Sequence, residues 1–209
     1  MSENYVVNAG QIFTLFFVML GPLKMLGPYA KATHALTPDK LRSVSINAVI
    51  LSLIAAVTGG YLGSHLLTSW DIPIAVLELT SGVIFFVMAL MMIVIPHKEE
   101  PISVKTIPEP EVKAPGIAFS MIVTPYGMAV VIGLLAMSGS MQRTMLILGM
   151  LVLVLFLDLL AMLYIRKIMG KTGMLVMQIV GAALAVLQAS LAMQMILLAV
   201  KLYRGEPLG

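Results

Sequence analysis

The sequence lacks cysteine altogether, and it contains only three histidines. Without cysteine it has no disulfide framework, no thiolate nucleophile and no cysteine-based metal site. The histidines are His34, His65 and His97, and none of them has the spacing of a histidine metal motif. No nucleophile–base pair can be recognised either. We therefore expect a protein that is not an enzyme and that binds neither a metal nor another cofactor.

Charged residues are also scarce: they make up 11% of the 209 residues, whereas a soluble domain carries about 25%. Hydrophobic residues make up 60%, and the mean hydropathy is +1.02. This composition predicts an integral membrane protein, so the first expected partner is the lipid bilayer. The formal net charge of +3 is too small, and its lysines are too dispersed, to predict a nucleic-acid partner.

Long apolar segments organise the chain. A helix needs about 20 apolar residues to cross a bilayer, and six segments come close to that length. They lie near residues 8–30, 45–68, 73–95, 116–138, 144–165 and 173–202. The fold class expected is therefore an all-α membrane protein with six transmembrane helices. The last segment is longer than a bilayer needs, so it should tilt or extend past the membrane surface.

The positive charges predict the orientation of these helices. Lysine and arginine gather on the cytoplasmic side of membrane proteins. The turns after segments one, three and five hold Lys31, Lys40, Arg42, Lys98, Lys105, Lys113, Arg166, Lys167 and Lys171. The opposite ends hold only Arg143, Lys201 and Arg204. We therefore expect both termini on the outer side, which is the periplasm if the membrane is a bacterial inner membrane.

One linker divides the chain. Between Pro96 and Pro115 the sequence is rich in proline and mixed charges, which argues against a packed element. The expected organisation is a first three-helix repeat at 1–96, a cytoplasmic linker at 97–115 and a second three-helix repeat at 116–209. The linker is interpreted as a solvated connector, with partner docking as the alternative.

The two halves resemble each other at their first helices. Each first helix is broken by proline, at Gly21-Pro22-Leu23-Lys24 in one half and at Thr124-Pro125-Tyr126-Gly127 in the other. Three spans per half would give the halves opposite orientations in the membrane. The prediction is thus two inverted repeats, an arrangement of many secondary transporters in which corresponding broken helices indicate the binding site.

At these motifs the chain resembles the MarC family of bacterial and archaeal inner-membrane proteins, which includes the SnatA amino-acid transporters. The resemblance covers most of the chain. It rests on Pro22 to Pro28, Leu36-Thr37-Pro38, Asp71-Ile72-Pro73, Ser81-Gly82, Thr124-Pro125-Tyr126-Gly127, Met169-Gly170-Lys171-Thr172-Gly173 and Gln194-Met195-Ile196-Leu197. It implies six helices in two inverted repeats, a bacterial inner-membrane location, and transport of small neutral amino acids such as glycine and alanine.

The chain also departs from the family pattern. The family usually carries Asn-Pro-x-Gly at the first break, where this chain has Gly21-Pro22-Leu23-Lys24. It tends to carry arginine where this chain has Glu78 and Gln178. These departures leave a second interpretation open, in which the protein is a non-transporting subunit or scaffold of a larger membrane assembly.

The two breaks supply the candidate substrate site. The anionic end of an amino acid favours a helix N-terminus, where free amides and the positive end of the dipole meet it. The candidate substrate-binding residues are Gly21, Pro22, Leu23, Lys24, Ser120, Thr124, Pro125, Tyr126 and Gly127. For Ser120 and Thr124 the alternative is a hydrogen bond from the hydroxyl to its own helix. Glu78, Gln178 and Gln188 are interpreted as interfacial or helix-joining polar residues.

Two charges inside the spans are candidates for proton or ion coupling. By position along their helices, Lys24 and Asp158 should lie at similar depth, which favours an ion pair. Alternatively Lys24 reaches the headgroups and Asp158 pairs with a backbone amide. We hypothesise that the Lys24 ammonium occupies the place of a coupling sodium ion. Transport would then be independent of sodium and could be linked to protons through Asp158.

Small residues mark packing faces. Ala48, Ser52, Ala56, Gly60 and Ser64 recur at every fourth position of the second segment. Such a stripe lets helix backbones approach closely. Whether it serves contacts within one chain, in a homo-oligomer or in a larger membrane complex stays open at this point.

Overall fold

The computed structural model describes residues 8–94, 113–168 and 171–205, and these residues form helices and turns without a strand. The elements are α1 (Ala9–Met19), α2 (Pro22–Thr33), α3 (Pro38–Ser69), α4 (Ile74–Val94), α5 (Ala114–Ile117), the π-helix η1 (Ala118–Ile122), α6 (Pro125–Ala136), α7 (Met141–Leu163), α8 (Ile165–Ile168) and α9 (Lys171–Arg204). The predicted all-α class is confirmed for this part of the chain.

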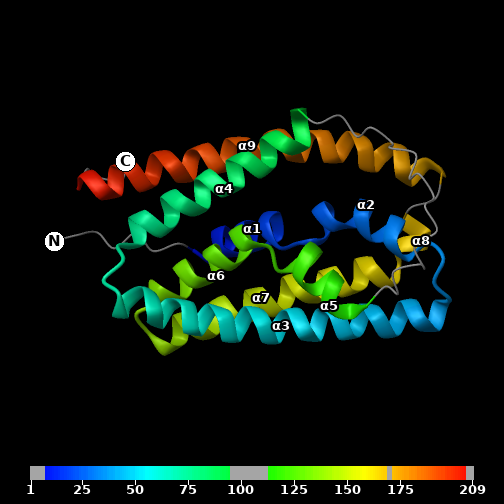
Figure 1. Ribbon diagram of the computed structural model, residues 1–209, viewed down its shortest axis with the longest axis horizontal. Helices are drawn as coiled ribbons and strands as arrows, with labels where there is room; N and C mark the ends of the chain where they lie inside the picture. Colours follow the sequence, from blue (N-terminus) through cyan, green and yellow to red (C-terminus); the bar gives the residue numbers. More distant parts are fainter. Residues whose placement is uncertain (1–7, 95–112, 169–170, 206–209) are drawn as a thin grey trace, which may run out of the picture.

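Five helical stretches are long and apolar enough to cross a membrane, with α1 and α2 together counting as one from Ala9 to Thr33. A sixth is reached if α5–η1 and α6, which are bent by 71° at their junction, form one span. The protein is therefore a multi-pass membrane protein. In Figure 1 successive spans alternate in direction, and α1 begins toward the end of the bundle where α9 finishes.

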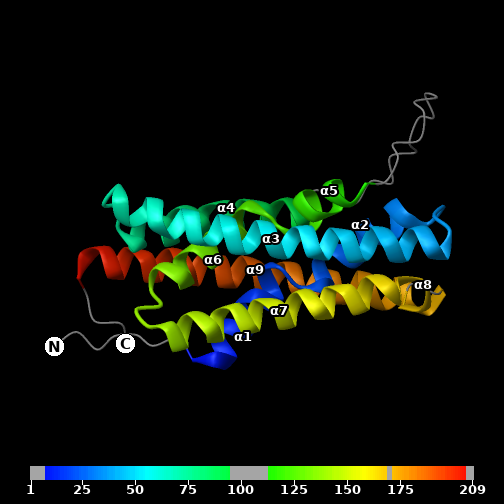
Figure 2. The ribbon, with the colours of Figure 1, turned by 90° about the horizontal axis from the view of Figure 1, so that it is seen from below.

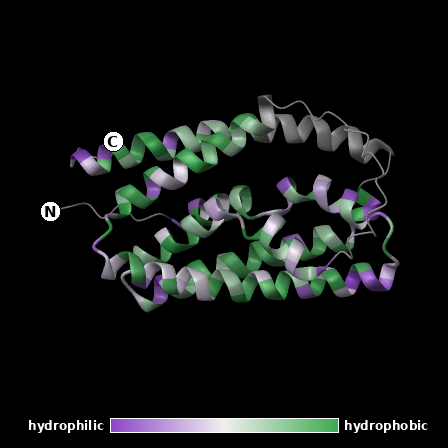
Figure 3. Ribbon diagram, in the orientation of Figure 1, coloured by the Kyte–Doolittle hydropathy of each residue, from purple (hydrophilic) through white to green (hydrophobic). Residues whose placement is uncertain are grey.

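The spans form two groups. Helices α4 and α9 pack along each other, and Gly82 of α4 lies so close to α9 that an added Cβ would be 2.9 Å from Ile196 Cγ1. Helices α1, α2, α3, α6 and α7 form the remainder of the bundle, which α4 joins through α6 (Figures 1 and 2). Apolar residues run along most of α4 and α7 and along the middle of α3 (Figure 3), as expected for faces in contact with lipid.

Local capping signals explain where several helices begin. The Asn8 side chain accepts a hydrogen bond from the Gln11 amide at 2.9 Å, and the Gln11 side chain accepts one from the Asn8 amide at 2.8 Å. Thr37 caps α3 in a similar way, with Pro38 in the first helical position. Because of this cap, α3 begins at Pro38, seven residues before the apolar segment predicted from 45 onwards. Apolar content marks the membrane part of the helix, not its full length.

The stripe of small residues on α3 is buried within the chain. Ala48, Ser52, Ala56 and Gly60 all lie at buried positions. A Cβ on Gly60 would lie 2.6 Å from Val131 Cγ1 of α6, so the helices approach at a distance that glycine permits. The question that the sequence left open is answered at Gly60, which serves a contact inside one chain.

The last helix and the linker can also be compared with their predictions. Helix α9 has 34 residues, about 51 Å at 1.5 Å per residue, and so exceeds a hydrocarbon core of about 30 Å, as predicted. Gln188 lies on α9 with 4% of its surface exposed. The predicted linker at 97–115 lies outside the described residues as far as 112, and α5 already begins at Ala114.

Candidate functional site

The first interruption lies between α1 and α2. Helix α1 ends at Met19, and α2 begins with Pro22 in its first position, where a missing N–H does no harm. The Gly21 amide donates to the carbonyls of Phe16 and Phe17, both at 3.1 Å. A side chain on Gly21 would collide with the Phe17 carbonyl oxygen. Glycine is therefore required at this point by the close approach of the preceding turn.

The second interruption has a different local structure. Helix α5 continues as the π-helix η1, in which the Val123 amide donates to the Ala118 carbonyl at 2.8 Å. The chain then turns, and α6 begins with Pro125 after the N-cap residue Thr124. π-helical turns are rare and are often found at functional sites. No sequence pattern predicted η1. We call the place where the two interruptions meet, residues 19–24 and 122–127, the crossing.

Lys24 bridges the two interruptions. Its Nζ donates to the Met19 carbonyl at 2.5 Å, to the Ile122 carbonyl at 3.3 Å and to Thr124 Oγ1 at 3.2 Å. Met19 and Ile122 are the last residues of α1 and η1. Carbonyls at helix C-termini carry partial negative charge and favour a cation. An ammonium group has three N–H donors and no acceptor, so these three oxygens match it fully.

An aromatic pair covers the ammonium from another side. The Tyr126 ring centroid lies 5.1 Å from Lys24 Nζ, a cation–π distance. Phe85 of α4 stacks on Tyr126 with ring centroids 5.0 Å apart and an angle of 28° between the rings. Both rings are buried. Through this pair, α4 takes part in enclosing a charge that belongs to α2.

Asp158 lies on α7 with none of its surface exposed. It interacts electrostatically with Lys24, in line with the predicted similarity in depth. However, neither carboxyl oxygen has a hydrogen-bond partner among the described residues. Lys24 therefore donates to the carbonyls of the crossing and neither bonds to Asp158 nor reaches for headgroups, and Asp158 does not bond to a backbone amide. Neither predicted arrangement of the two charges is the one observed.

The two interruptions also touch through apolar atoms. A Cβ on Gly127 would lie 2.5 Å from Leu20 Cδ2, so Leu20 fills the space that this glycine leaves. The N-cap residues Gly21 and Thr124 make no side-chain hydrogen bond to the N-terminus of α2 or of α6. The crossing thus combines two helix C-terminal ends that are bound to an ammonium with two helix N-terminal ends that are not capped by their own N-cap side chains.

The structure brings most of the predicted site residues to the crossing, with some exceptions. Pro22 and Thr124 are buried there, Leu23 is half-buried, and Pro125 is exposed. Ser120 is exposed and donates to the Gly116 carbonyl of its own helix at 2.5 Å, so it adds no hydroxyl to the crossing.

Two other polar residues were singled out from the sequence. Glu78 is half-buried on α4, and the Gln178 side chain lies outside the described residues. The main atoms of the crossing that the sequence did not indicate are the two carbonyls of Met19 and Ile122. Backbone atoms leave no compositional signal, and only the helix ends on which they lie could have suggested them.

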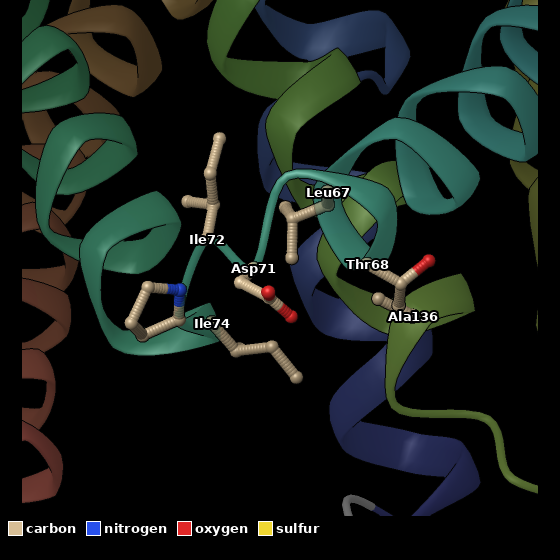
Figure 4. Close-up of a pocket in the computed structure, with 7 residues that line it drawn as sticks. Leu67, Thr68, Asp71, Ile72, Ile74 and Ala136 are labelled. Atoms are coloured by element: carbon tan, nitrogen blue, oxygen red, sulfur yellow. The ribbon is translucent and has the colours of Figure 1, made fainter.

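A pocket of about 470 Å³ lies elsewhere, at the end of the bundle where the turn between α3 and α4 meets the end of α6 (Figure 4). Asp71 in this turn has a φ of 50°, a left-handed conformation that aspartate tolerates. The residues that line the pocket are Leu67, Thr68, Asp71, Ile72, Pro73, Ile74 and Ala136. None of them belongs to the crossing.

No family model, no curated protein and no solved structure matches this chain.

Proposed function

We propose that this protein is a secondary transporter of a small polar metabolite, a small neutral amino acid such as glycine or alanine, that works by alternating access around the crossing. The observation that carries the proposal is the Lys24 ammonium, which donates to Met19 O and Ile122 O at the ends of two interrupted helices. In transporters with broken helices, such carbonyl ends hold coupling ions and the facing N-termini hold anionic substrate groups.

The proposal includes two inverted three-helix repeats, with their first helices broken at Pro22 and Pro125. Corresponding spans run in opposite directions along the bundle (Figure 1). The packing is also consistent with a two-fold relation: α3 packs on α6 as α7 packs on α2, and α3 packs on α5 as α7 packs on α1. The third helices of the two halves, α4 and α9, pack on each other.

Within this proposal the crossing recognises a zwitterion. The substrate carboxylate would meet the amides at the N-termini of α2 and α6, which are not capped by their own N-cap side chains. Lys24 would act as a tethered cation at the carbonyl ends, in the place of a sodium ion. Transport is then expected to be independent of sodium.

The first experiment measures the thermal stability of the purified protein against a panel of neutral amino acids, with and without sodium. A ligand at 100 times its Kd stabilises the folded state by about 2.7 kcal/mol. We expect a shift with glycine or alanine that does not depend on sodium, and exchange of the same amino acid in proteoliposomes. An Asp71→Asn variant is the control, because it changes the peripheral pocket and leaves the crossing intact. Absence of both shift and exchange contradicts the proposal.

A second candidate function is a non-transporting subunit or scaffold of a larger membrane assembly. The observation that favours it is the filling of the crossing by side chains, since Leu20 packs on Gly127 and Lys24 occupies the carbonyl ends. This candidate predicts no response to any amino acid. It also predicts a membrane protein that co-purifies in fixed stoichiometry, either a different subunit or a second copy of this chain.

A further inference from the structure

Asp158 is the one acidic side chain that is fully buried among the described residues, and both of its carboxyl oxygens lack a hydrogen-bond partner. We propose that Asp158 is a proton-binding site, which carries its proton while the Lys24 ammonium is held by the crossing and releases it when that ammonium turns to the carboxylate. This inference rests on the proposed transporter function and deepens it by naming the coupling ion and its site.

The first step of the argument is the state of Lys24. Its Nζ donates to three oxygens, those of Met19, Ile122 and Thr124. Two of these oxygens are carbonyls, which only accept, and an ammonium supplies three N–H donors, one for each of the three oxygens. In this arrangement we take Lys24 to be charged, with its three donors used by the crossing. It has no donor left for Asp158.

The second step is the surroundings of Asp158. Helix α7 packs against α1, α2, α3, α6 and α8. Between their bounds α1 and α6 carry no aspartate, glutamate, lysine, arginine or histidine, and Lys24 is the charged group with which Asp158 interacts. The other charged or titratable residues of these elements are Lys31, Asp39, Lys40, Arg42, Tyr61, His65, Arg166 and Lys167, all exposed, and the buried Tyr29 and Tyr126. Tyr29 is hydrogen-bonded to Ser45, and Tyr126 lies against Lys24.

The third step follows from desolvation. A buried carboxylate without a partner is strongly unfavourable, and such a group takes up a proton instead. In the present arrangement Asp158 is thus a neutral acid. If the Lys24 ammonium moves from the carbonyls to Asp158, the carboxylate gains its missing partner and the proton leaves to water. The same move frees Met19 O, Ile122 O and Thr124 Oγ1 for the ammonium group of a substrate.

Infrared difference spectroscopy of the full-length protein in detergent tests this directly, because the C=O stretch of a protonated carboxylic acid is separate from the bands of a carboxylate. The spectrum is recorded across a pH titration for the wild type, Asp158→Asn and Glu78→Gln. Glu78 is the matched control, since it is a half-buried acid on another span, α4. We expect a protonated-acid band at neutral pH that is lost in Asp158→Asn and retained in Glu78→Gln.

A Lys24→Met variant tests whether proton release from Asp158 depends on Lys24. Without an ammonium to stabilise the carboxylate, the Asp158 band should persist to higher pH than in the wild type. A band lost at the same pH in both proteins contradicts the proposed movement of the ammonium to Asp158. A wild type without the band also overturns the inference. In that case a band that appears only in Lys24→Met indicates a direct ion pair, and sodium-dependent stability indicates a bound sodium ion. If Lys24→Met does not fold, the other three proteins still decide whether Asp158 holds the proton.

The infrared band and amino-acid transport are independent readouts. Sodium-independent transport without the band refutes the proton site and leaves the proposed function standing. The band without any amino-acid binding or exchange refutes the transporter proposal, and with it the coupling role that depends on that proposal.

Discussion

Removing the Lys24 ammonium should turn the crossing into a site for a free monovalent cation. In Lys24→Ala the oxygens of Met19, Ile122 and Thr124 lose the donor that they share. The Ile122 carbonyl keeps the bond from the Thr124 amide at 3.1 Å, so the main loss is at the Met19 carbonyl. A buried acceptor that loses its partner costs about 1–3 kcal/mol. If this cost is about 2 kcal/mol, the melting temperature of Lys24→Ala should fall by roughly 4–8 °C for a chain of this size.

Sodium should reverse that loss. At 100 times its Kd a bound ion returns about 2.7 kcal/mol, enough to restore the wild-type melting temperature. Alanine is preferred over glycine at this helical position, because glycine would add a cost of about 0.5–1 kcal/mol of its own. The matched control is Lys24→Met, which removes the same donors but fills the space with an uncharged side chain.

The assay is thermal unfolding of the purified variants in sodium chloride and in choline chloride at equal ionic strength. We expect no difference between the salts for the wild type or Lys24→Met, and a higher melting temperature in sodium for Lys24→Ala. Should Lys24→Ala be as indifferent to sodium as Lys24→Met, the view of Lys24 as a substitute for a coupling cation is refuted.

Three further predictions concern packing, and each can be measured by thermal or denaturant unfolding. Gly21→Ala should cost about 3 kcal/mol or more, because its Cβ would meet a backbone carbonyl that cannot move aside. Gly149→Ala on α7, whose new Cβ meets nothing within 4 Å outside its own helix backbone and chain neighbours, should be neutral or stabilising by up to about 1 kcal/mol. Gly60→Ala should cost about 1–3 kcal/mol by forcing α3 away from α6, and Gly149→Ala is the control here too. Tyr126→Phe should keep the cation–π contact and the stability of the wild type, and Tyr126→Leu should lose about 0.5–2 kcal/mol. Equal effects within any of these pairs would contradict the contacts described.

The sequence was sufficient to predict five of the spans and the prolines at which α2 and α6 begin, and the sixth span depends on whether α5–η1 and α6 form one. Apolar runs of membrane length and proline at a helix start are local properties, so Pro22 and Pro125 could be recognised without a structure. The beginning of α3 at Pro38 was predictable from its threonine cap, but hydropathy alone placed it later. The inverted relation of the halves stays a prediction.

The contacts of the crossing could not be predicted from the sequence. The partners of Lys24 include the carbonyl of Ile122, 98 positions away in the chain. Every residue has a carbonyl, so the sequence cannot single out the carbonyl of Ile122. This carbonyl lies at the bend of 71° between η1 and α6, where the helix is interrupted. Equal depth suggested an ion pair between Lys24 and Asp158, but it could not tell that two backbone carbonyls and a threonine hydroxyl would take the three lysine donors.

The contact between Leu20 and Gly127 makes the two halves complementary and not interchangeable. When the motifs around Pro22 and Pro125 are superposed by sequence, Gly127 occupies the position of Lys24. One half therefore contributes a long charged side chain at this position, and the other contributes a glycine, which has no side chain. Two copies of the first half would bring two ammonium groups to one junction, and two copies of the second would bring none. In the proposed inverted repeat, neither half could therefore be replaced by a second copy of the other without changing the charge at the crossing.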